Sequence, residues 1–85
     1  MKYNVYLESD SIAMKYFIFE SNIDLDKSGE DIEKEKKLRD EVEQYLKENE
    51  TITLINGDEI KTEIIDSFLI RTHNLSKLNI KGKMN

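Results

Sequence analysis

The chain is short, acidic and free of cysteine: its 85 residues carry 18 acids, 13 bases and one histidine, for a formal charge of −5. This length allows a single domain over residues 1–85 with one core, but not a deep substrate cavity as well. The absence of cysteine excludes disulfides, cysteine-ligated metal sites and a thiol nucleophile. No apolar run is long enough to span a membrane, and the first residues lack the apolar region of a signal peptide, so we expect a cytoplasmic protein without membrane contact.

The first twenty residues predict a β-hairpin. Tyr3, Val5 and Leu7 alternate with other residues along a first strand, and the polar residues 9–11 are a turn signal. The next strand is apolar on both faces from Tyr16 onward, which predicts a central position in a sheet. We therefore expect a hairpin over about residues 2–20.

Residues 29–49 predict an amphipathic helix. Ser28 and Asp31 resemble a capping box, since a hydroxyl accepts from first-turn amides and an acid suits the positive end of the helix dipole. Glu35 falls inside the apolar stripe, with Arg39 one turn later as its expected partner. That stripe contains Leu38, Val42, Tyr45 and Leu46, with Ile32 at its margin.

The C-terminal half predicts strands again. A three-residue loop at residues 55–57 pairs Ile52 with Ile60 and places Gly57 in the left-handed region, keeping the apolar residues on one face. Residues 59–72 form either one bent strand or two. Beyond them, residues around Ile80 add a short edge strand, or 74–85 form a loosely packed basic tail. The predicted fold is α+β: an antiparallel sheet of about four to five strands with one amphipathic helix packed on it, in the order ββα and then two to four strands.

One loop resembles the calcium loop of EF-hands. Counting from Asp24, side chains with oxygen atoms occupy alternate positions, Gly29 is sixth and Glu35 is twelfth. A loop that wraps around Ca²⁺ needs oxygen ligands at this spacing, a glycine for its sharp turn and a final glutamate. The sequence departs from the EF-hand pattern in three ways. It has no apolar residue at the eighth position, no predicted helix before the loop and no second EF-hand to pair with. A turn followed by a capped helix fits the same residues. The candidate ligands are Asp24, Asp26, Ser28, Glu30 and Glu35.

Catalytic and cofactor-binding motifs are absent from the sequence. His73 is the single histidine, and no acid in the sequence is placed to orient it as a general base. The glycines are too scattered for a phosphate-binding loop. We therefore expect a protein that is not an enzyme and that carries no cofactor.

Charge divides the chain into two unequal parts. Residues 1–66 hold nine bases and all 18 acids, a balance of −9, whereas residues 67–85 hold four bases and no acid, a balance of +4. An acidic body disfavours nucleic acid, because phosphate neutralisation supplies most of that affinity. The basic end is the alternative nucleic-acid surface, through Arg71, Lys77, Lys81 and Lys83.

A short stretch supports that alternative. Residues 51–60, continuing to Ile64 and Phe68, look like the Asn-Gly hairpin of Sm-like RNA-binding proteins, which implies RNA binding. The resemblance covers about 20 residues. The two strands before the helix depart from that family's pattern.

The function that these features favour is non-enzymatic binding of a macromolecular partner. Carboxylates clustered on one helix face steer a basic protein partner and speed its association. An inhibitor of a host nuclease or defence complex, encoded by a phage or mobile element, would use them as mimics of nucleic-acid phosphates. The expected partner-binding residues are Glu30, Glu33, Asp40, Glu41 and Glu48. A homodimer through an exposed edge strand is a further expectation.

Overall fold

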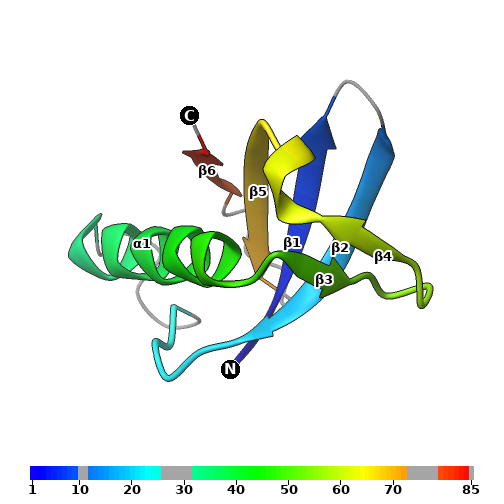
Figure 1. Ribbon diagram of the computed structural model, residues 1–85. Helices are drawn as coiled ribbons and strands as arrows, with labels where there is room; N and C mark the ends of the chain where they lie inside the picture. The colour runs from blue at the N-terminus through cyan, green and yellow to red at the C-terminus, as the bar shows by residue number, and fades with distance from the viewer. Residues whose placement is uncertain (10–11, 26–31, 73–78, 85) are drawn as a thin grey trace.

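A computed structural model describes residues 1–9, 12–25, 32–72 and 79–84 as an α+β fold, in agreement with the prediction (Figure 1). Its first elements are strands β1 (Lys2–Ser9) and β2 (Ile12–Glu20) and helix α1 (Ile32–Glu48). Strands β3 (Thr51–Thr53) and β4 (Glu59–Lys61) follow, and then a 3-10 turn, η1 (Thr62–Ile64). Strands β5 (Ser67–Thr72) and β6 (Asn79–Lys83) complete the order.

The main sheet has four antiparallel strands in the order β2-β1-β5-β6. The predicted N-terminal hairpin is present, with Tyr6 opposite Tyr16. The prediction that its second strand is central was wrong, because β1 is central and β2 lies at the edge. Its two apolar faces have separate contacts: Phe17 and Phe19 pack at the core, and Tyr16 packs against Tyr6 on the other face. The edge itself is partly covered, because the backbone N–H of Ile55 donates to Tyr16 O at 3.0 Å.

Strands β3 and β4 form the predicted hairpin. Ile52 pairs with Ile60, and Leu54 N donates to Asp58 O at 2.7 Å. Gly57 has φ of 90°, a conformation that glycine adopts without the steric cost a Cβ would bring. The three-residue loop and its register are therefore confirmed.

The segment from 59 to 72 is two strands rather than one. Turn η1 interrupts it, and Thr62 ties that turn to the end of the helix: its N–H donates to Glu50 O at 2.9 Å and its hydroxyl to Asn49 O at 2.6 Å. The chain then enters the main sheet as β5, beside β1. Strand β6 follows as the predicted edge strand.

The core lies between one face of the sheet and two elements that cover it. We call this the inner face; it carries Tyr3, Val5, Phe17, Phe68 and Ile70. Helix α1 and the β3–β4 hairpin both lie in front of it (Figure 1). From α1, the predicted stripe residues Leu38, Val42 and Leu46 are buried.

The margins of the helix differ from the prediction. Ile32 is 77% exposed, because the first turn of α1 extends beyond the sheet. Tyr45, near the other end of the helix, is 38% exposed because it lines an open groove. Glu35 and Arg39, both described and both half-buried, form no ion pair with each other. The predicted start of the helix at residues 28–31 lies outside the described residues.

Candidate functional site

The chain that leaves β2 runs alongside the helix. We call residues 21–25 the exit segment. Leu25 is 3% exposed, and the buried Tyr3 of β1 holds the segment from below. The Tyr3 hydroxyl donates to Ile23 O and accepts from Leu25 N at 3.2 Å. One side chain in the central strand therefore fixes the path of the exit segment.

A second set of bonds joins the exit segment to α1. The hydroxyl of Ser21 lies 3.0 and 3.2 Å from the two carboxylate oxygens of Glu41, and it also accepts from Ile23 N at 3.1 Å. Ser21 is 5% exposed, so its hydrogen bonds to Glu41 lie at the buried side of the contact between the exit segment and α1. Glu41, expected from the sequence as a partner-binding acid, therefore also joins two elements.

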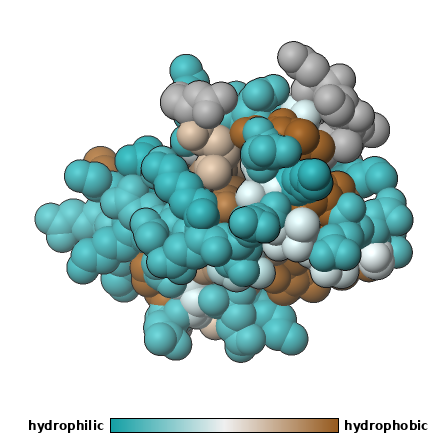
Figure 2. Space-filling model, in the orientation of Figure 1, coloured by the Kyte–Doolittle hydropathy of each residue, from teal (hydrophilic) through white to brown (hydrophobic). Residues whose placement is uncertain are grey.

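Between the exit segment and α1 lies an open groove of about 600 Å³. Its residues come from the end of β2, from the exit segment and from one flank of the helix. Figure 2 shows hydrophilic surface over α1 with patches of hydrophobic surface below it. The lining residues are Phe19, Ile23, Lys37, Asp40, Glu41, Gln44, Tyr45 and Glu48.

The floor of the groove is apolar. Tyr45 meets Phe19 edge-on with ring centroids 5.5 Å apart, and stacks on the buried Phe17 at 5.7 Å. Phe19 and Ile23 are half-buried, so each has apolar surface that the fold leaves accessible. The sequence prediction placed Tyr45 in the core and did not include Ile23. The 3.6-residue period identifies the stripe but does not show that its edge remains open.

The rim of the groove is acidic. Asp40, Glu41 and Glu48 are exposed along one side of the helix, and Lys37 is the single base among the lining residues. The rim therefore carries a net charge of −2, from three acids and one base. Gln44 donates to Glu48 Oε1 at 2.8 Å and holds that carboxylate in place.

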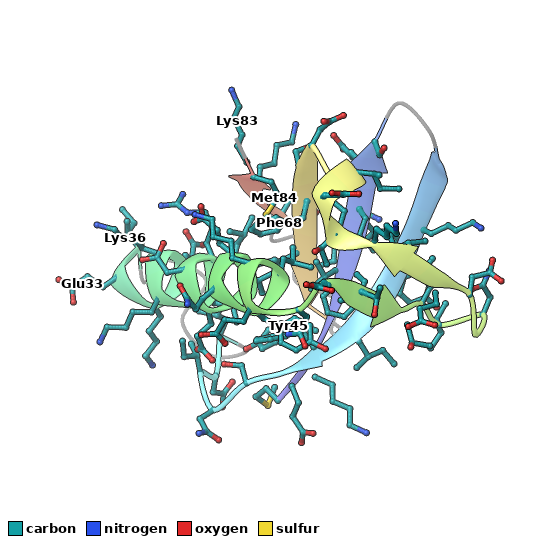
Figure 3. All side chains as sticks on the ribbon, viewed as in Figure 1. Glu33, Lys36, Tyr45, Phe68, Lys83 and Met84 are labelled. Atoms are coloured by element: carbon teal, nitrogen blue, oxygen red, sulfur yellow. The ribbon has the colours of Figure 1, made fainter. Side chains whose placement is uncertain are left out.

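The five acids expected to bind a partner do not all lie together. Three of them line the groove. Glu33 lies at the end of α1 that projects away from the sheet, far along the helix from Tyr45 (Figure 3). Glu30 lies outside the described residues. Because basic residues such as Lys36 and Lys37 are interspersed along α1, the helix face is mixed in charge rather than uniformly acidic.

The calcium loop lies mostly outside the described part of the chain, including Asp26, Ser28 and Glu30. Asp24 is exposed, and Glu35 lines a hollow of about 250 Å³ between α1 and β6 with Arg39 and Lys81. Among the described residues, no cluster of three metal-binding side chains occurs. Calcium binding stays a prediction without a structural observation in its favour.

The basic residues proposed for nucleic acid occupy the other side of the sheet. Arg71 in β5 and Lys81 and Lys83 in β6 are exposed, and the pairing of the two strands puts them on the face opposite to the core. Because β6 is an edge strand, Lys81 also borders the hollow beside α1. Lys77 and the lone histidine, His73, lie outside the described residues.

The groove is the most promising protein-binding feature of the described surface, since it combines apolar floor, charged rim and size. A smaller hollow, of about 360 Å³ beside the end of α1, mixes Lys47 and Lys61 with Glu50 and Glu63 and favours neither sign of ligand. No helix in the described part of the chain is long and apolar enough to cross a membrane. Compared with protein-family models, curated proteins and solved structures, the chain matches none.

Proposed function

We propose that this protein is a small binding domain that holds a basic segment of a protein partner in the groove between α1 and the exit segment. The observation that carries the proposal is the position of three acids around an apolar hollow. A large apolar side chain of the partner enters between Phe19, Ile23 and Tyr45. Its neighbouring lysine or arginine side chains meet the acidic rim.

The apolar floor of the groove supplies most of the affinity, and the acidic rim supplies the encounter rate and the selectivity. Burial of an apolar side chain stabilises the complex by about 1.5–3 kcal/mol. Exposed ion pairs add only about 0.2–1 kcal/mol each, but they speed encounter and select a basic sequence. Basic segments with apolar neighbours are common where proteins contact nucleic acid. Inhibition of a nuclease or defence complex, encoded by a phage or mobile element, is the specific role we propose.

Peptide selection tests the groove. We expect peptides selected from a random displayed library on the immobilised protein to combine lysine or arginine with a large apolar residue. Titration of a selected peptide should shift the amide NMR signals of Phe19, Ile23 and Tyr45. The double variant Asp40→Lys, Glu48→Lys should weaken binding roughly tenfold, since two attractions become repulsions. Glu41 stays unchanged because it bonds Ser21.

The matched control is Glu33→Lys with Glu63→Lys. It changes the net charge by the same amount at two exposed sites outside the groove. If both double variants weaken the peptide equally, net charge rather than the groove attracts the partner. Selected peptides without basic residues would also contradict the proposal.

A further inference from the structure

The face of the sheet opposite the core is a second surface, which we call the outer face. Among the described elements, α1 and the β3–β4 hairpin both lie on the inner face, and none lies on the outer one. Strand pairing aligns one residue from each strand into a row across it. That row is Tyr16 from β2, Tyr6 from β1, Leu69 from β5 and Lys81 from β6.

The β1–β2 half of the outer face is aromatic. The rings of Tyr6 and Tyr16 lie 5.0 Å apart at an interplanar angle of 35°, and both side chains are half-buried. Ile18, beside them in β2, is 43% exposed. Rings held at a sheet surface in this way can stack with the flat face of a nucleobase.

The β5–β6 half is cationic. The Arg71 guanidinium lies 5.5 Å from the centre of the Tyr6 ring, so charge and aromatic surface adjoin. Lys81 and Lys83 line a hollow of about 220 Å³ at the edge of this face, together with Ser67 and Glu8. The carboxylate of Glu8 accepts from the Ser67 hydroxyl at 2.8 Å. Counting Lys2 and Glu20 as well, the outer face carries four bases and two acids.

We propose that the outer face binds single-stranded nucleic acid. One base stacks on Tyr16 and a second packs at the Tyr6–Arg71 pair, and the phosphates between and beyond them meet Arg71, Lys81 and Lys83. Four strands spaced about 4.8 Å apart make the row roughly 14 Å across, enough for a strand of a few nucleotides. A duplex hides its bases from such a flat surface, whereas a single strand exposes them for stacking on the rings.

Fluorescence anisotropy with a labelled oligothymidylate of about 12 nucleotides tests this directly. We expect a Kd of roughly 1–100 µM at low salt, with a log–log salt slope near −2 for three neutralised phosphates. Tyr16→Ala should weaken binding roughly 5- to 100-fold, whereas Tyr16→Phe, which keeps the ring, should bind like the parent. Stacking of bases on the rings should also quench tyrosine fluorescence, which can be measured because the chain has no tryptophan.

A charge-matched pair of variants completes the design. Lys81→Glu with Lys83→Glu should abolish most binding, and Lys36→Glu with Lys61→Glu, at exposed sites on α1 and β4, should weaken it far less. Circular dichroism confirms that each variant folds. No binding at low salt, equal loss in both pairs, or equal affinity for a duplex of the same length would overturn the proposal. Asp40→Lys with Glu48→Lys should not weaken oligonucleotide binding, so this surface and the groove can fail separately.

Discussion

The hydroxyl of Tyr3 connects the centre of the sheet to the wall of the groove. Tyr3→Phe removes the acceptor of the buried Leu25 N–H and the donor to Ile23 O. We expect the free energy of unfolding, measured with urea, to fall by about 1–3 kcal/mol. Hydrogen exchange at the Leu25 amide should accelerate at the same time, because the exit segment loses its tie to β1.

The control for that variant is Tyr6→Phe. It removes a hydroxyl from the same strand, but on the outer face, and should change stability by less than about 0.5 kcal/mol. An equal loss in both variants would show that the two bonds to the exit segment add nothing specific.

Gly82 is a second residue at which a single side chain would change the packing, because it has no Cβ and the Phe68 ring lies against it. It lies opposite Phe68, and a Cβ added at Gly82 would lie 2.6 Å from both Cε atoms of the Phe68 ring and closer still to its Cζ. Phe68 is 1% exposed and cannot move outward freely. We expect Gly82→Ala to destabilise the fold by about 1–3 kcal/mol in urea unfolding, although alanine usually favours ordered structure over glycine.

A double-mutant cycle isolates that overlap. In a Phe68→Leu background the obstructing ring atoms are gone, so Gly82→Ala should cost much less than in the parent. Purely additive effects would mean that the ring and the glycine do not interact.

At the scale of elements, the β3–β4 hairpin docks on β2 through Lys15 and Asp58, whose charged atoms lie 3.0 Å apart. The hydrogen bond from Lys15 lowers the pKa of Asp58 below 3.8, and a second from Asn56 lowers it further. A carboxylate whose pKa is lower in the folded than in the unfolded chain stabilises the fold at pH values above the unfolded pKa. This contribution disappears as the pH falls through the lowered pKa. In Lys15→Met, NMR titration should show a higher Asp58 pKa that is still below 3.8, because Asn56 remains.

The stability difference between the parent and Lys15→Met should therefore be present at neutral pH and shrink in acid. A difference that persists unchanged below the Asp58 pKa would point to packing of the lysine stem instead of the ion pair.

Helices, strands and turns that a local pattern defines were predictable from the sequence. Which strands lie next to each other in the sheet was not. Gly57 and the alternation around Ile52 and Ile60 determine the hairpin register within about ten residues, so local rules suffice. The central position of β1 depends on pairing with β5, more than 60 residues away for Tyr6 and Leu69. No local pattern encodes that choice.

The candidate groove was predictable only in part for the same reason. Periodicity places Asp40, Glu41 and Glu48 on the solvent side of the helix, but their meeting with Ile23 requires the tertiary path of the exit segment. The hydrogen bond from Ser21 to Glu41 likewise joins residues 20 positions apart. The role of Ile23 carried no sequence signal beyond its apolar side chain.

At the scale of the whole molecule, the sheet separates two kinds of charge. The acid-rimmed groove lies on the side of the helix, and the bases Arg71, Lys81 and Lys83 lie on the opposite face. The shortest extent of the molecule is 21 Å, more than twice the Debye length of about 8 Å at physiological salt, so the two surfaces are largely screened from each other. The formal charge of −5 is thus a sum over faces of unlike chemistry, and it describes neither surface by itself.

The strand order also has a consequence for synthesis. The central strand β1 is made before the other described strands, yet its second neighbour, β5, is completed only at residue 72. Until then the nascent chain holds a hairpin with an unpaired edge at β1, the kind of edge that recruits other strands. The sheet therefore cannot close around β1 until β5 and β6 have been made.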